Sequence, residues 1–127
     1  MKIVYRDGLL YTTLEIRHMG RRKMIDNVVI DTGAARTILS PDAVIDVGIK
    51  YGLGDRIVGA YGIGGMQYAF EKKVDTVKFG SFVIQNCTID FGLIDEHGTV
   101  NGLLGLDLLV EAEVVIDFKN MLVHEAV

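Results

Sequence analysis

Residues 28–40 read Val28-Val29-Ile30-Asp31-Thr32-Gly33-Ala34-Ala35-Arg36-Thr37-Ile38-Leu39-Ser40, and this stretch decides the fold. Its first three residues are β-branched and predict a buried strand, because such side chains suit a pleated core surface. Gly33 then lets the chain turn with backbone angles that a side chain would forbid. The stretch therefore places the Asp31 carboxylate at the end of an apolar strand. Alone, an Asp-Thr-Gly triplet is more typical of an Asx turn, in which the aspartate bonds its own backbone.

Two later motifs change that interpretation. One is the glycine-rich segment Val58-Gly59-Ala60-Tyr61-Gly62-Ile63-Gly64-Gly65-Met66, and the other is Asn101-Gly102-Leu103-Leu104-Gly105-Leu106-Asp107-Leu108-Leu109. With residues 28–40, they resemble in order the catalytic loop, the flap hairpin and the apolar-apolar-Gly segment of the retropepsin-like aspartic proteases. The resemblance runs from Leu14 to Leu109 and is strongest at these three places.

This resemblance implies an aspartic endopeptidase fold in which two chains assemble one active site. It assigns the catalytic site to Asp31, Thr32 and Gly33, which supply a carboxylate, a hydrogen-bond lock between the two loops, and a contact to the substrate backbone. It also implies that a peptide or protein substrate lies between the catalytic loop and the flap. The implied substrate-binding residues are Ala34, Ala35, Tyr61, Gly62, Ile63, Gly64, Leu103 and Leu104.

The chain contains a single Asp-Thr-Gly, and this count bears on the mechanism. Two close carboxylates cannot both ionise, so they share a proton; one can then activate water while the other protonates the carbonyl oxygen. Because the other aspartates lack the small-residue context, we expect the second carboxylate to be Asp31 of another copy, in a homodimer. The alternative is a dimerisation or peptide-binding module of the same fold with weak or absent activity. A small-ligand β-barrel explains the motifs poorly.

Two positions differ from many retroviral relatives. Those relatives carry an acid two places after the glycine and an arginine after the apolar-apolar-Gly, and the two form a charged dimer lock. Here the positions hold Ala35 and Leu106, an apolar pair that resembles the cellular members of the family, including the DNA-damage-inducible type. We therefore expect apolar burial to hold the dimer, with the hairpin at residues 113–125 available to extend a sheet across the two-fold axis.

The composition fits a single domain over residues 1–127. Hydrophobic residues make up 50% of the chain, which excludes a disordered protein, and no apolar run is long enough for a membrane span. The formal net charge of −4 argues against nucleic acid as a partner. The one cysteine, Cys87, indicates a reducing, cytoplasmic setting and a buried position on a strand. Because His18, His97 and His124 are scattered, we expect neither a metal nor a cofactor.

Fifteen glycines and one proline separate short alternating runs, which predicts an all-β domain built as a closed or partly closed barrel with a flap hairpin. We expect one short helix after Ser40, with Pro41 in its first turn and Gly48 at its end. Another is expected after Gly105, over Leu108 to Glu111 with Asp107 as its cap. The strand over residues 114–116 is apolar throughout, so we expect both of its faces to be covered. Hairpin turns are predicted at residues 7–8, 20–23, 62–65, 80–81 and 119–120.

Overall fold

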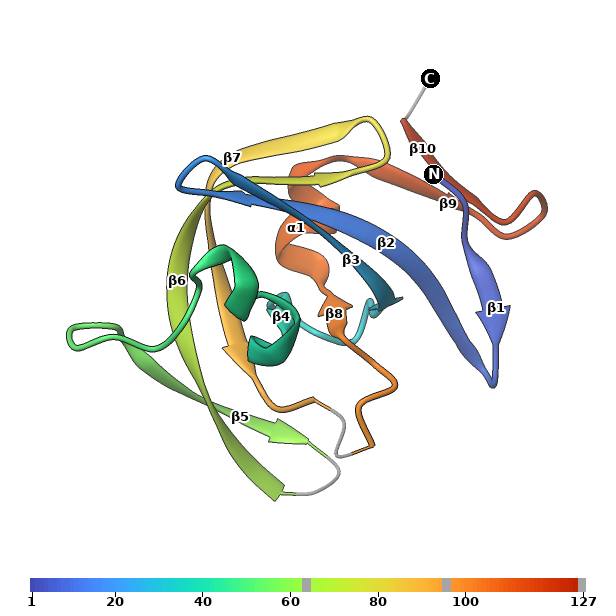
Figure 1. Cartoon of the computed structure of the whole chain (residues 1–127). Coiled ribbons are helices and arrows are strands. Elements are labelled where there is room, and N and C mark those ends of the chain that lie inside the picture. The colour runs from blue at the N-terminus through green and yellow to red at the C-terminus, as the bar shows by residue number, and fades with distance from the viewer. Residues whose placement is uncertain (63–64, 95–96, 126–127) are drawn as a thin grey trace.

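The computed structural model describes residues 1–62, 65–94 and 97–125, and within them the protein is built mainly of strands (Figure 1). A single α-helix, α1 (Leu106–Glu111), and two short 3₁₀ turns, η1 (Pro41–Ala43) and η2 (Ile45–Val47), accompany the strands in these ranges. The strands are β1 (Val4–Arg6), β2 (Leu9–His18), β3 (Arg21–Ile30), β4 (Ile38–Leu39), β5 (Ile57–Gly62), β6 (Gly65–Phe79), β7 (Phe82–Gly92), β8 (Gly102–Leu104), β9 (Val114–Asp117) and β10 (Leu122–Glu125).

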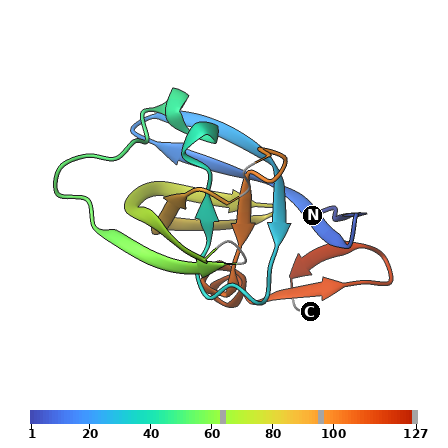
Figure 2. The same cartoon turned by 90° about the horizontal axis from the view of Figure 1, so that it is seen from below.

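Six strands close a barrel, which confirms the predicted all-β architecture. The large sheet runs in the order β1-β2-β3-β8-β4-β7-β6-β5, and a further pairing of β2 with β6 joins its two sides. Glu15, Ile16 and Arg17 of β2 form that closing contact, opposite residues 76–78 of β6. As a result, β1 and β5 extend beyond the closed part, and β9 and β10 form a separate two-stranded sheet (Figures 1 and 2).

The tight turns between strands follow the turn chemistry of the sequence. Asp7 and Gly8 have φ angles of 52° and 80°, and Met19 and Gly20 have φ angles of 50° and 80°. Two successive residues with positive φ are the mark of a type I′ turn, whose twist matches that of the strands it joins. The hairpin at Asp7-Gly8 is therefore confirmed. The second turn is tighter than expected, because β3 already begins at Arg21.

The two helical predictions fared differently. After Ser40 the predicted short helix is present as two 3₁₀ turns, η1 with Pro41 at its start and η2, although the Ser40 side chain makes no capping hydrogen bond. The expected end is confirmed at Gly48, which has a φ of 83°. The segment is too short to repay the ordering of an α-helical nucleus, which is why it settles into isolated turns. The α1 helix follows Gly105 as predicted and already begins at Leu106.

The barrel interior is filled by side chains from every strand of the closed part. Cys87 lies in this core, as predicted, and burial raises the pKa of its thiol to about 11. One expectation was wrong: Val115 of β9 is 38% exposed, so the part of the chain that the structure describes leaves one face of this strand partly open. The largest fully buried side chains are those of Phe79, Phe91, Leu14, Ile16, Ile25, Leu39, Ile49, Ile89, Leu104, Val28, Val44 and Val74.

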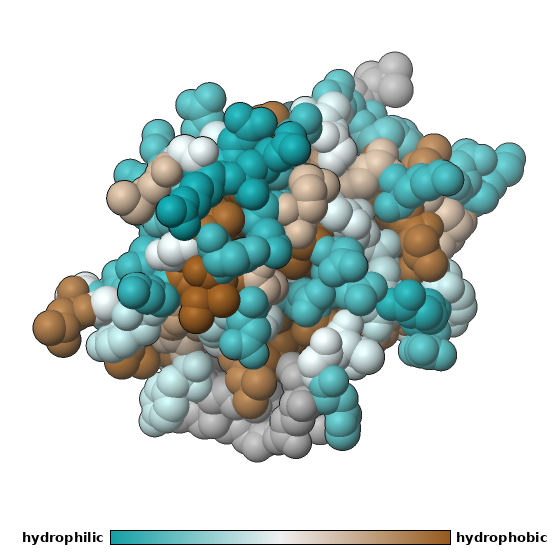
Figure 3. Space-filling model, in the orientation of Figure 1, coloured by the Kyte–Doolittle hydropathy of each residue, from teal (hydrophilic) through white to brown (hydrophobic). Residues whose placement is uncertain are grey.

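Charged residues gather on the outer surface near the β2–β3 turn, at the upper left of the view in Figure 3. There the Glu15 carboxylate lies 3.3 Å from Arg22 Nε and 3.7 Å from Arg17 Nε. The arginines are exposed while the Glu15 side chain is nearly covered. This polar end of the barrel is at the start of β3, one strand length away from Asp31.

Candidate active site

Asp31 follows directly on the last residue of β3, and its backbone is anchored to β8. The Asp31 N–H donates to the Leu104 carbonyl oxygen at 2.9 Å. β3 and β8 run parallel, with Val28 opposite Gly102 and Ile30 opposite Leu104. Two motifs that lie some seventy positions apart in the sequence are therefore neighbours in one sheet, and the apolar-apolar-Gly segment supports the loop as the resemblance implied.

The Asp31 side chain is held by the turn that it begins. The Gly33 N–H donates to Asp31 Oδ1 at 2.9 Å, and the Ala34 N–H donates to the Asp31 carbonyl oxygen at 3.1 Å. The Asx turn is thus present, and it fixes the direction of the carboxylate. Asp31 itself is half-buried, whereas Thr32 and Gly33 are exposed. A carboxylate that is oriented by the backbone at an exposed loop is available to a partner or a substrate.

The second half of the loop lies against the start of α1. The Leu106 N–H donates to the Ala34 carbonyl oxygen at 2.8 Å, and the Asp107 N–H donates to that of Ala35 at 3.2 Å. The approach at Gly105 is so close that a Cβ atom there would lie 2.8 Å from the Ala34 oxygen and 2.8 Å from the carbonyl carbon of Arg36. These are backbone atoms that cannot swing away, so position 105 requires glycine.

An ion pair beside the loop was not predicted. Arg36 Nε and Nη2 donate to the two carboxylate oxygens of Asp90 at 2.9 and 2.8 Å, and Nη2 lies 3.5 Å from Glu71 Oε1. The Asp90 hydrogen bond raises the pKa of Arg36 above its usual value. The only sequence signal was a carboxylate inside the apolar run Ile89-Asp90-Phe91, which marks a paired charge when the strand is buried.

Thr37 and Asp107 form a second connection that sequence reasoning missed. Asp107 does not cap the second helix as expected, because α1 already begins at Leu106 and its N-cap is Gly105. From the first turn of α1, Asp107 Oδ1 instead accepts the Leu108 N–H at 2.9 Å. It also accepts the Thr37 hydroxyl at 2.7 Å. Pattern alone gives no sign of this contact, because the two residues are 70 positions apart.

The predicted substrate-binding residues are distributed over three places. Ala34 and Ala35 lie in the loop, Ala34 half-buried and Ala35 exposed. Leu103 is half-buried, but Leu104 is 0% exposed in the barrel core. A core side chain with no exposed surface does not line a substrate pocket, so the structure contradicts that role for Leu104.

The predicted flap corresponds to the hairpin of β5 and β6. Tyr61 pairs with Met66 and Gly62 with Gly65 along its backbone, and the predicted tip residues Ile63 and Gly64 lie outside the described residues. The hairpin joins the barrel where Ala69 pairs with Gly92 of β7. Residues 57–62 and 65–68 therefore extend beyond the barrel wall (Figures 1 and 2).

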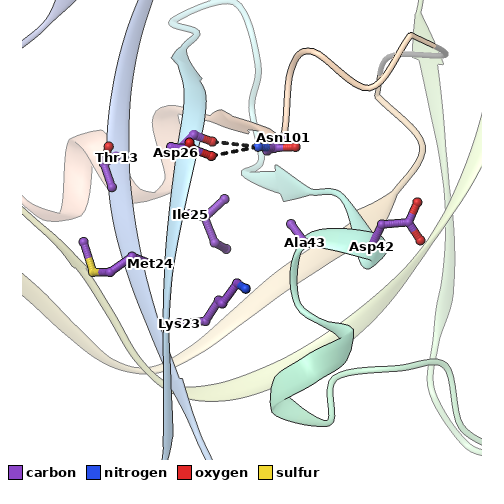
Figure 4. A pocket seen from close by; sticks show the side chains of 8 residues that line it. All are labelled: Thr13, Lys23, Met24, Ile25, Asp26, Asp42, Ala43 and Asn101. Carbon is purple, nitrogen blue, oxygen red and sulfur yellow. Dashed lines mark hydrogen bonds between the residues drawn. The ribbon is translucent and has the colours of Figure 1, made fainter.

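A surface cavity of about 410 Å³ lies elsewhere, between β2, β3 and η1 (Figure 4). Asn101 closes one side of it, donating from Nδ2 to the carbonyl oxygen and to Oδ1 of Asp26 at 3.0 and 3.1 Å. Its part of β3 lies five or more residues before Asp31, and it contains none of the predicted site residues. The cavity is lined by Thr13, Lys23, Met24, Ile25, Asp26, Asp42, Ala43 and Asn101.

Two further features concern the residues that the structure describes. No group of three or more histidine, cysteine, aspartate or glutamate side chains is arranged there to hold a metal ion. The described part of the chain also has no helix of the length and apolar character that a membrane crossing requires.

Comparison with known proteins bears on the fold and the family. Residues 22–111 match the family described as gag-polyprotein putative aspartyl protease. Among solved structures, the chain is similar to a retropepsin-like aspartic protease from Rickettsia conorii, with a TM-score of 0.66 and 22% identity over 94% of this chain and 92% of that one. No curated protein gave a significant match. The family match includes Asp31, the β5–β6 hairpin and α1.

Proposed function

The chain belongs to the gag-polyprotein putative aspartyl protease family, and on this premise we propose that it is an aspartic endopeptidase active as a homodimer. The observation that carries the proposal is the Asp31 loop: a carboxylate oriented by the Gly33 N–H, on a loop fixed between β8 and α1. The rest of the site is consistent with that chemistry, because the loop residues beside Asp31 are exposed.

In the proposed reaction, the Asp31 carboxylates of two copies face one another and share one proton. The ionised member takes a proton from a water molecule, which attacks the peptide carbonyl carbon, and the protonated member donates to the carbonyl oxygen. The tetrahedral intermediate then collapses with protonation of the leaving amine. Each chain supplies one Asp-Thr-Gly, so neither copy alone provides both the acid and the base.

Exposed apolar side chains around the loop support the homodimer. Leu106 is 39% exposed and Val110 is 68% exposed, both on α1, and Ala35 of the loop, whose carbonyl oxygen accepts the Asp107 N–H, is exposed as well. The outer face of Val115 on β9 is also open. Apolar surface of this kind is favourable to cover, and a two-fold contact covers it on both chains at once.

The substrate in this proposal is an extended peptide that lies between the two Asp31 loops and the β5–β6 hairpins. Gly33 and Ala34 would meet its backbone and Leu103 its side chains, while Tyr61, Gly62, Ile63 and Gly64 would cover it. Flexible glycines suit a cover that must open for substrate and close over it.

Asp31→Asn tests the proposal, because asparagine keeps the size and the acceptor oxygen of the side chain but cannot take up the proton. We expect cleavage of a peptide library, screened from acid to neutral pH, to fall by about 1,000-fold or more. Asp42→Asn, at an exposed position away from the loop, is the matched control. Peptide binding without cleavage by both the wild type and the Asp31→Asn variant would instead identify a binding module.

A further inference from the structure

A buried hydroxyl connects the end of the catalytic loop to the segment that supports it. Thr37 is 1% exposed. Its Oγ1 accepts the Gly105 N–H at 3.0 Å and donates to Asp107 Oδ1 at 2.7 Å. A buried hydroxyl with both a donor and an acceptor partner has one allowed orientation, so Thr37 is locked in place.

The Asp107 carboxylate is the centre of this connection. Besides the hydroxyl, it accepts the Thr37 N–H at 2.9 Å on Oδ1 and 3.0 Å on Oδ2, and the Leu108 N–H at 2.9 Å on Oδ1. Hydrogen bonds to an ionised acceptor are about twice as strong as neutral ones. One side chain thus ties residue 37 of the loop to the first turn of α1.

The other hydrogen bonds of the loop show which segment the Thr37–Asp107 contact holds in place. The loop is attached to β8 at its first residue, through the Asp31 N–H and the Leu104 oxygen. It then meets α1 through the Leu106 and Asp107 N–H groups. With Thr37 fixed to Asp107, the loop is held at both ends, and its carboxylate has little freedom to shift.

We propose that Asp107 is a positioning residue for catalysis: through Thr37 and the first turn of α1, it fixes the loop so that the Asp31 carboxylates of two copies meet at the separation at which they share a proton. This inference rests on the proposed peptidase function and deepens it. In this role Asp107 acts through Thr37 and needs no contact with the attacking water or the peptide.

A specific signature follows from this role. Two carboxylates that share a proton titrate as a pair, with one apparent pKa lowered and the other raised. If the loops drift apart, the coupling weakens and the two apparent pKa values approach each other. The bell-shaped dependence of kcat/KM on pH then becomes narrower, whereas a simple loss of folded protein lowers the bell without changing its width.

The experiment compares variants that remove the Thr37–Asp107 hydrogen bonds with variants that keep them. Asp107→Ala and Thr37→Val should lower kcat by about 10- to 100-fold, since small displacements of reacting groups are this costly, with KM changed far less. Both should narrow the pH profile. Asp107→Asn keeps an acceptor oxygen, and Thr37→Ser keeps the hydroxyl. Both variants should therefore retain most of the activity and the full width of the pH profile.

Asp75→Ala is the matched control. The Asp75 carboxylate also accepts a backbone N–H, that of Met19 at 2.9 Å, but at the β2–β3 turn at the other end of the barrel. The proposal is overturned if Asp107→Ala and Thr37→Val lose no more kcat than this control. It is equally overturned if their loss matches the unfolded fraction and the profile keeps its width.

A second readout separates this inference from the proposed function. Amide hydrogen exchange at Leu106 and Asp107, whose N–H groups bond the loop, needs no activity. We expect faster exchange at both in Thr37→Val and Asp107→Ala but not in Asp75→Ala. If the wild-type chain cleaves no peptide, the peptidase proposal fails, and unchanged exchange at these amides would then overturn the positioning role as well.

Discussion

The Asp31 loop and the β5–β6 hairpin are held to the barrel in opposite ways. The loop from Asp31 to Thr37 is bonded to β8 at one end and to α1 and Asp107 at the other. The hairpin continues the barrel sheet only as far as Ala69, opposite Gly92, and beyond that point β5 pairs with β6 alone. The loop is therefore hydrogen-bonded at both of its ends, whereas the hairpin is joined to the barrel only at its base.

This difference suits the two tasks in the proposed reaction. A carboxylate pair that shares a proton needs a constant separation, whereas a cover over an extended peptide has to open and close. At the base of the hairpin, Phe70 stacks on the buried Phe91 with ring centroids 5.4 Å apart. This contact anchors the base of the β5–β6 hairpin, so in the proposed reaction the Asp31 loop would serve as a fixed floor and the hairpin as a hinged cover.

The largest expected effect comes from Gly105→Ala, which disturbs the close contact between Gly105 and the Asp31 loop. The added methyl group would meet backbone atoms of Ala34 and Arg36 at 2.8 Å, and relief requires the loop to move. We expect the free energy of unfolding to fall by about 2–3 kcal/mol and peptidase activity to be lost. Urea denaturation measures the first change. Gly52→Ala, whose Cβ would lie 3.5 Å from its nearest neighbour, should be close to wild type.

Hydrogen exchange compares the two regions directly in the unliganded protein. The hydrogen-bonded amides of Asp31, Leu106 and Leu109 should exchange about 100-fold more slowly than hydrogen-bonded amides of residues 57–59 and 68, because the hairpin can open without disturbing the barrel. Equal protection of the amides in the loop and α1 and of those in the β5–β6 hairpin would contradict the expected difference between a fixed loop and a hairpin that opens.

The smallest expected effect concerns the loop that leads into β5. Asp55 Oδ2 accepts the Lys72 ammonium at 2.6 Å and the Gly52 N–H at 2.7 Å, and the Lys72 hydrogen bond lowers the pKa of Asp55. A lowered pKa means that this contribution to stability is present above the ordinary aspartate pKa and is lost as the pH falls through the lowered value. Asp55→Asn should therefore be slightly less stable than wild type at neutral pH.

Thermal denaturation at a series of pH values checks the sign of this effect. The melting temperatures of the wild type and of Asp55→Asn should converge as the medium becomes acidic, because both side chains are then uncharged. A difference that stays constant down to strongly acidic pH would show that the charge of Asp55 contributes nothing.

Local patterns predicted what depends on local chemistry. Asp7-Gly8 determined its own turn, the β-branched run before Asp31 formed a buried strand, and Cys87 took a core position. The adjacency of Asp31 and Leu104 came from family resemblance, since no periodicity reports a pairing of strands so far apart.

The missed features are contacts that tertiary structure alone creates. Thr37 meets Asp107 and Arg36 meets Asp90 across 70 and 54 positions. The residues next to each member of these pairs do not indicate its partner, because the two members come together only when the barrel closes. The sequence predicted a short helix after Ser40 but not its type: a run of so few residues forms 3₁₀ turns, because it is too short to nucleate an α-helix.

The mixing of wild-type protein with Asp31→Asn, after time for the copies to exchange, tests most directly whether two Asp31 residues make one active site. If they do, a mixed dimer is inactive, and activity follows the square of the wild-type fraction, so an equal mixture retains about a quarter of the activity of the same total concentration of wild type. Activity that falls only in proportion to the wild-type fraction, to about half in the equal mixture, would mean that each chain works alone and would contradict the account.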